Sequence, residues 1–194
     1  MPQITPDSLM TLEAYAKARK QFRAKVIAHK KNRTIHLGQH VTLLFEDELT
    51  IRYQVQEMLR IERIFEEQGI KDELDAYNPL IPDGTNWKAT MLIEYDDVEL
   101  RKQMLGKLIG IENRTWVRVA GFDKVYAIAD EDLERERADK TSSVHFLWFE
   151  LAPDMIAALK LGADLGMGVE HPQYEVAIAE IDPVSREALV ADLR

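Results

Sequence analysis

The feature that most constrains the fold is a change of hydrophobic period near residue 34. Between Leu9 and Val26 the apolar residues recur at helical spacing, which predicts a helix from Thr5-Pro6 to about His29. From Thr34 to Phe45 the apolar residues alternate with polar ones, which is typical of a half-buried strand. A hairpin at Gly38-Gln39 is the alternative, but pairing Leu37 with His40 would break the two-face pattern. We therefore expect one strand here.

The rest of the chain continues this mixture of helical and strand patterns. Asp47 can cap a helix over residues 48–68, which Gly69 would end. Further strands are expected at 86–95, 114–119, 124–129, 143–151, 165–169 and 174–181, and helices at 98–108, after Pro153 and after Pro183. The charged stretch 130–140 is expected to be an exposed loop or a short helix. Strands outnumber helices, so we predict one α+β domain over residues 1–194, a mainly antiparallel sheet with helices packed on it.

The composition excludes several classes of chemistry. The chain contains no cysteine, which rules out disulfides, thiolate nucleophiles and cysteine-bound metals, and which suits a reducing cytosol. It shows no secretion signal and no apolar run long enough to span a bilayer, so we expect a soluble, cytoplasmic protein that does not associate with a membrane. No phosphate-binding loop, nucleotide, flavin or hydrolase motif is present. Whether the protein is an enzyme, and with what cofactor, is left open at this point.

The charge of the chain is unevenly distributed. A net charge of −9 disfavours nucleic acid as a partner, because phosphate contacts need a basic surface. Yet the segment from Lys17 to Arg33 carries eight lysines and arginines and no acidic residue. One interpretation is a solvated helix face. The other is a docking surface for an anion or an acidic protein, with these candidate residues: Arg23, His29, Lys30, Lys31 and Arg33.

One carboxylate in the predicted helix after Asp47 interrupts an apolar stripe. At about 100° per residue, Glu62 falls in the middle of an arc formed by Ile51, Val55, Met58, Leu59, Ile61 and Phe65. Glu66 lies one turn further along. A buried carboxylate must be paired, hydrogen-bonded or protonated. Three alternatives stay open: a salt bridge to a neighbouring element, a shared divalent metal or substrate, and partial exposure.

Two further candidate sites involve a histidine and a loop. His145 shares a strand face with Leu147 and Phe149, so we expect it to point into the core, either as a hydrogen-bonded packing residue or as a ligand that meets Glu62. The loop from Tyr77 to Trp87 contains two prolines and three polar candidates for a pocket wall: Asn78, Asp83 and Asn86. A simple connection between helix and strand explains this loop equally well.

Three long segments carry a resemblance to a known family. They are VIAHKKNRTIHLGQHVTLLFEDELTIRYQVQEMLRIERIF, ELDAYNPLIPDGTNWKATMLIEY and DKTSSVHFLWFEL. With them the chain resembles a bacterial family catalogued as domain of unknown function 3501, over essentially its whole length. The resemblance implies gene neighbours that encode a rubrerythrin-like protein and an iron–sulfur protein similar to heterodisulfide reductase subunits. It thereby implies a redox or peroxide-defence setting, but it identifies no catalytic residue in this chain.

Two functional hypotheses follow. The first is an accessory protein that docks on a rubrerythrin-like or iron–sulfur partner protein through the basic segment. The second is a metal- or small-ligand-binding protein, enzyme or not, built around Glu62, Glu66 and His145.

Overall fold

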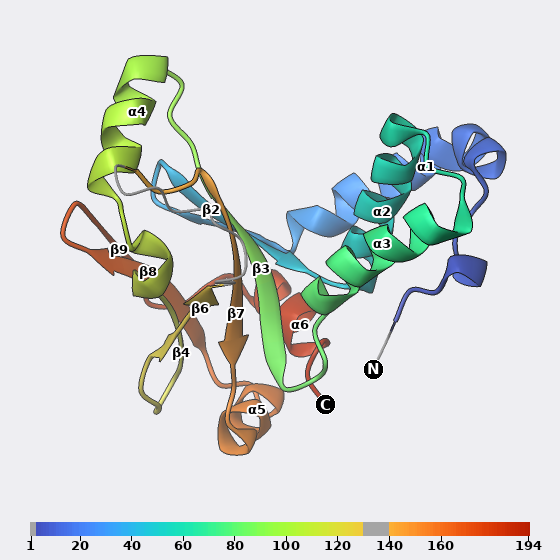
Figure 1. Cartoon of the computed structure of the whole chain (residues 1–194). Helices are drawn as coiled ribbons and strands as arrows, with labels where there is room; N and C mark the ends of the chain where they lie inside the picture. The colour runs from blue at the N-terminus through green and yellow to red at the C-terminus, as the bar shows by residue number, and fades with distance from the viewer. Residues whose placement is uncertain (1–2, 130–139) are drawn as a thin grey trace.

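Two antiparallel sheets form the body of the protein (Figure 1). The computed structural model describes residues 3–129 and 140–194, so most of the predicted charged loop at 130–140 lies outside the described residues. The first sheet has the order β1 (Thr34–Leu37), β2 (Val41–Glu46), β3 (Asn86–Ile93), β7 (Val144–Glu150) and β6 (Ile128–Ala129). The second has the order β5 (Val125–Tyr126), β4 (Thr115–Val119), β8 (Leu165–His171) and β9 (Tyr174–Ile178). The predicted α+β class with antiparallel strands is confirmed, and the strands divide between two sheets.

The main hydrophobic core contains the inner faces of both sheets. Alternate residues along each strand enter it, as a period of two requires: Leu43 and Phe45 from β2, Leu147 and Phe149 from β7, Val117 from β4 and Met167 from β8. Trp87 of β3 is fully buried, and its indole Nε1 donates a hydrogen bond to the carbonyl oxygen of Leu189 at 2.9 Å. This bond satisfies the polar atom of the largest core side chain.

The first sheet begins with a hairpin, so the prediction of one strand over residues 34–45 is wrong. A turn formed by Gly38, Gln39 and His40 joins β1 to β2, and Leu37 pairs with Val41 rather than with His40. Gly38 has a φ of 75°, a conformation that glycine adopts without steric cost. A three-residue turn preserves the alternation of buried and exposed positions. The pattern alone therefore could not reveal the reversal of the chain.

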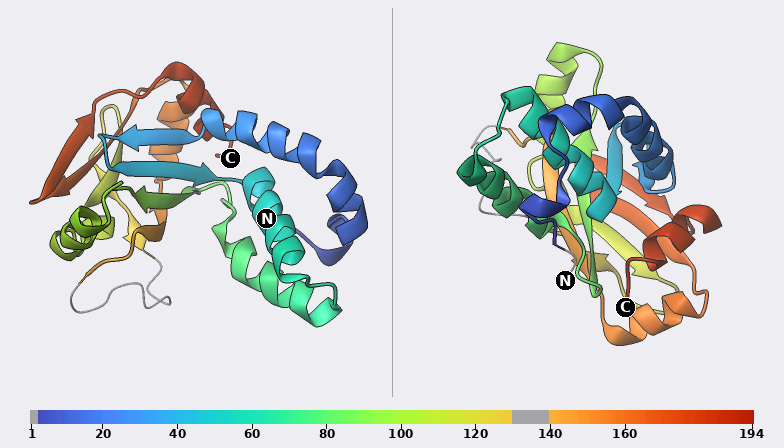
Figure 2. Two further views of the ribbon diagram at one scale, coloured as in Figure 1. Left: turned by 90° about the horizontal axis from the view of Figure 1, so that it is seen from above. Right: turned by 90° about the vertical axis from the view of Figure 1, so that its right-hand side faces the viewer.

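Three helices form a lobe beside the first sheet (Figures 1 and 2). This helical lobe consists of α1 (Leu12–Lys31), α2 (Glu48–Glu62) and α3 (Glu67–Tyr77), together with the 3₁₀ turn η1 (Pro6–Ser8). The predicted helix start at Thr5-Pro6 is only that turn, and Thr11 caps α1 instead. A second, smaller hydrophobic cluster holds the lobe together, formed by Ile4, Ile51, Val55, Leu59, Leu74 and Ile81.

The helix predicted over residues 48–68 is two helices. Asp47 caps α2 as predicted, but α2 ends at Glu62, and Arg63 adopts the left-handed conformation with a φ of 55°. Glu66 is the N-terminal cap of α3, and Gly69 lies inside α3 rather than at a helix end. A left-handed arginine has no sequence signal, because this conformation normally marks glycine or asparagine.

Three further helices complete the described structure. They are α4 (Val98–Lys107), α5 (Pro153–Lys160) and α6 (Pro183–Val190), with the 3₁₀ turns η2 (Asn78–Leu80) and η3 (Ile111–Arg114). The predictions of these three helices, and of strands at β3, β7, β8 and β9, are confirmed. Within the described ranges, no helix combines the length and the apolar character needed to cross a membrane.

Candidate functional site

The buried carboxylate pair predicted from the helical wheel is not formed. Glu62 and Glu66 are both exposed, and they belong to different structural elements. The side of α2 that packs inward contains Ile51, Val55 and Leu59, whereas Ile61 is 60% exposed. In the last turn of α2, Leu59 points into the small core of the lobe, whereas Ile61 and Glu62 point away from it. Of the three alternatives for Glu62, exposure is the one that the structure supports.

His145 is buried in β7, as its strand position predicts, but its acidic neighbour is not Glu62. Its Nε2 lies 2.9 Å from the hydroxyl of Thr141, 3.0 Å from the carbonyl oxygen of Ser142 and 3.9 Å from the carboxylate of Glu112 in η3. Glu62 lies instead on the helical lobe. Glu112 is buried, and no pattern in its short 3₁₀ turn indicated this. In residues 3–129 and 140–194, no group of three or more acidic or histidine side chains is arranged to hold a metal.

Two residues of the predicted docking surface belong to an ion cluster. Arg33 is 2% exposed; its guanidinium donates hydrogen bonds to the carboxylate of Asp192 at 2.5 Å and to the carbonyl oxygen of Phe45 at 2.9 Å. His29 lies 2.5 Å from Asp47, the cap of α2. Burial raises the pKa of Asp192, while the hydrogen bond from Arg33 opposes that change. The prediction that Arg33 offers a docking surface is therefore wrong, because its side chain is buried. The His29 side chain is 34% exposed beside Asp47, so its part in a docking surface stays a prediction.

The other basic residues lie on the outer side of α1. Arg23 and Lys31 are exposed as predicted, whereas Lys30 is half-buried, with its ammonium 5.7 Å from the ring centre of Tyr53. We define the basic face of α1 by its exposed cations, Lys17, Lys20, Arg23, Lys25 and Lys31, together with the exposed small or apolar residues between them, Ala24, Ile27 and Ala28. None of these five cations forms an ion pair with another residue of the described chain. Lys20 and Lys31 stand about 16 Å apart along the helix.

Glu57 of α2 anchors the opposite side of α1. Its carboxylate accepts hydrogen bonds from Arg19 Nε at 2.7 Å, from the hydroxyl of Tyr15 at 2.6 Å and from Arg60 at 3.1 Å. The hydrogen bond from Arg19, helped by those from Tyr15 and Arg60, lowers the pKa of Glu57 to about 2. Burial, helped by the hydrogen bond to Glu57, raises the pKa of Tyr15. No local sequence pattern indicates the role of Glu57, because Tyr15 and Arg19 lie 42 and 38 residues away in the chain.

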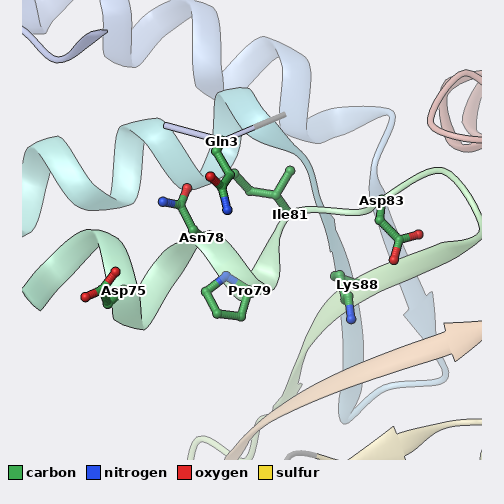
Figure 3. A pocket seen from close by; sticks show the side chains of 7 residues that line it. All are labelled: Gln3, Asp75, Asn78, Pro79, Ile81, Asp83 and Lys88. Atoms are coloured by element: carbon green, nitrogen blue, oxygen red, sulfur yellow. The ribbon is translucent and has the colours of Figure 1, made fainter. Parts of the chain in front are cut away.

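A pocket of about 310 Å³ lies between the helical lobe and the first sheet (Figure 3). Asn78 and Asp83 line it as the loop prediction proposed, and in Figure 3 Asp75 stands across the pocket from Asp83 and Lys88. Asn86 does not line this pocket. It is buried, and its amide donates a hydrogen bond to Glu150.

Most polar groups of this pocket form hydrogen bonds or contacts within the protein. The Asn78 amide accepts a hydrogen bond from the backbone N–H of Ile4 and donates one to its carbonyl oxygen, both at 3.0 Å. Hydrogen bonds from Thr85 lower the pKa of Asp83 and keep it ionised. The ammonium of Lys88 lies 4.5 Å from the ring centre of Trp148. The loop is thus a pocket wall and at the same time a clamp for the N-terminal segment.

Comparison with known proteins places this arrangement in a family. Residues 3–193 match the family described as "Protein of unknown function (DUF3501)". The structure is similar to a crystal structure at 1.90 Å resolution of a protein from Burkholderia pseudomallei K96243, described as a novel protein of unknown function. The two share 57% identity and a TM-score of 0.95, with 100% of each chain covered. No curated protein matches the chain.

Proposed function

The chain belongs to the DUF3501 family, and we propose that it acts as an accessory protein that binds an acidic partner protein through the basic face of α1. One observation carries the proposal. Five exposed cations without an ion-pair partner in the described structure lie on one helix of a protein whose net charge is −9.

The composition of this face suits a protein partner better than a nucleic acid. Ala24, Ile27 and Ala28 form a small apolar centre between Lys20 and Lys31, and Ile27 is 49% exposed. A protein interface commonly has an apolar centre and a polar rim. Nucleic acid carries dense negative charge that the strongly acidic remainder of this chain would repel. Acidic side chains that flank a small apolar patch on the partner would complement both parts of the face.

The basic face is held rigidly. Glu57 fixes the N-terminal half of α1 through Tyr15 and Arg19, and Arg33 and His29 fix its C-terminal end. A helix anchored at both points can dock without first being ordered, so less binding free energy is lost to conformational entropy. The cations on such a helix also accelerate association with an acidic surface.

The redox setting remains part of the proposal. The family resemblance suggests rubrerythrin-like and iron–sulfur proteins as partners, and these are the first candidates to purify and titrate. Our proposal requires of them only an acidic docking patch.

The test compares two double charge reversals that change the net charge equally. Lys20→Glu/Lys31→Glu reverses the two lysines on either side of the apolar centre of the basic face, and Lys107→Glu/Lys160→Glu reverses two exposed lysines elsewhere. The wild type and each variant are immobilised and exposed to a lysate of the native cells. Each captured protein is then purified and titrated against all three. We expect an acidic protein that binds the wild type and the control variant, but not the α1 variant, and that dissociates at high salt. Identical capture by all three proteins would contradict the proposal.

A further inference from the structure

The tip of the helical lobe carries a groove that the proposed function does not use. Its volume is about 450 Å³, and it lies between the N-terminal segment and the corner where α2 meets α3. Figure 1 shows this tip at the end of the lobe farthest from the sheets. The walls are mainly apolar, and the residues that form most of them are Leu9, Met10, Leu12, Leu59, Ile64 and Phe65.

The apolar character continues beyond the groove onto open surface. Phe65 is 73% exposed and Ile61 is 60% exposed, although both are large side chains that water solvates poorly. Leu9, Leu12 and Ile64 pack against the small core of the lobe and are only half-buried. Apolar side chains gathered around a groove mark an interaction site more often than a lone exposed residue does.

The backbone at the corner presents Phe65 outward. Arg63 ends α2 in the left-handed conformation, the single non-glycine residue with a positive φ in the described chain. This conformation costs a non-glycine residue free energy. The turn directs Ile64 into the groove and leaves Phe65 in solvent. A polar residue at position 65 would suit the fold alone, whereas a partner that covers the phenylalanine would remove its apolar surface from water.

The rim of the groove is acidic. Glu13 lines the groove, and Asp7 and Glu66 directly follow the lining residues Pro6 and Phe65 in the chain. Glu62 and Arg63 lie at the same corner, and all five of these charged residues are exposed. Burial, and after it the negative charges of Glu62 and Asp72, raises the pKa of Glu73 on α3. Such a rim attracts cations and repels an anionic membrane surface or a nucleic acid.

We propose that this groove binds an amphipathic segment of a partner protein, with apolar side chains that enter the groove and cover Phe65, and with lysines or arginines that face the acidic rim. A helix suits the site, because its apolar residues recur on one side and its basic residues can flank them. The groove has an acidic rim and selects a basic partner, whereas the basic face of α1 selects an acidic one.

The experiment uses a displayed library of randomised helical peptides as the probe and the full chain as the target. Selection is run on the wild type, on Phe65→Ser and on Leu161→Ser, a matched control that removes a 90% exposed apolar residue outside the groove. Enriched peptides are then synthesised and titrated against each protein and against Glu62→Lys/Glu66→Lys. Circular dichroism confirms that every variant is folded.

We expect the wild type and Leu161→Ser to enrich basic amphipathic peptides whose affinity falls at least about tenfold in Phe65→Ser. The charge-reversal variant should also bind them more weakly, and added salt should reduce that difference. Peptides bound at α1 would instead be acidic, sensitive to Lys20→Glu/Lys31→Glu and indifferent to Phe65→Ser, so the two proposals can fail separately. Three outcomes would overturn the groove proposal: no enrichment that depends on Phe65, enrichment of acidic peptides that depends on it, or self-association of the wild type that Phe65→Ser abolishes.

Discussion

Glu57 is the side chain whose replacement should most clearly reveal how α1 is held. In Glu57→Gln the amide keeps one oxygen acceptor, but its NH₂ group cannot accept the hydrogen bonds that Arg19, Tyr15 and Arg60 donate to the carboxylate. The negative charge that attracts the two arginines is lost as well. We therefore expect a less stable protein in which α1 detaches more easily from α2.

The expected loss of unfolding free energy in Glu57→Gln follows from the pKa of Glu57. A carboxyl whose pKa falls from an ordinary 4.5 to about 2 on folding contributes up to about 3.4 kcal/mol at neutral pH. Arg19 is about one-third exposed, so solvent screening reduces the expected loss to roughly 2 kcal/mol. For a chain of 194 residues this corresponds to a decrease in Tm of about 4–8 °C.

The pH dependence has a definite sign. Because folding lowers the pKa of Glu57, the stabilisation is fully present above the ordinary pKa of 4.5 and is lost as the pH falls toward about 2. The difference in unfolding free energy between wild type and Glu57→Gln should therefore shrink by roughly 1 kcal/mol between neutral pH and about pH 3.5. Urea unfolding followed by circular dichroism at both pH values measures it.

Glu62→Gln is the matched control, since it makes the same chemical change on the same helix at an exposed position. Its unfolding free energy should differ from that of the wild type by no more than about 0.5 kcal/mol. Equal destabilisation by the two substitutions, or a loss in Glu57→Gln that does not change with pH, would refute the assignment of Glu57 as the anchor of α1.

Three other substitutions test particular contacts. Replacing the buried Arg33 by Met should cost about 3–5 kcal/mol, because the buried Asp192 would lose the guanidinium that pairs with it, and Asp192→Asn in the same background should recover part of the loss in urea unfolding. Gly168→Ala should destabilise by at least about 1–3 kcal/mol, since a Cβ there would lie 2.4 Å from the carbonyl oxygen of Val176 and 2.5 Å from the indole of Trp116; an unchanged Tm would show that β8 can shift. Asn78→Ala removes both hydrogen bonds to Ile4, so limited proteolysis should cut the N-terminal segment faster than in the wild type, whereas an equal rate would mean that apolar contacts alone hold it.

Much of the secondary structure could be predicted from the sequence, because hydrophobic period and helix-capping residues act locally. The strand at β7, the helix at α4 and the helix start at Asp47 follow from such patterns, and each is present. The buried position of His145 also follows from alternation along one strand. The period of two at residues 34–45 correctly indicated extended chain, but it persists through a three-residue turn, so the hairpin required the pairing of Leu37 with Val41.

The candidate sites depended on which surfaces meet, and this only the tertiary structure decided. A helical wheel places Glu62 among apolar residues, yet α2 ends at Glu62 and only one side of it packs inward, so both Glu62 and Phe65 lie in solvent. A run of basic residues predicts a basic surface, but Asp192, far away in sequence, removes Arg33 from it. Local sequence determines which elements form and which side of each is apolar. Burial and ion pairing are decided by neighbours distant in the chain, whose positions no local pattern encodes.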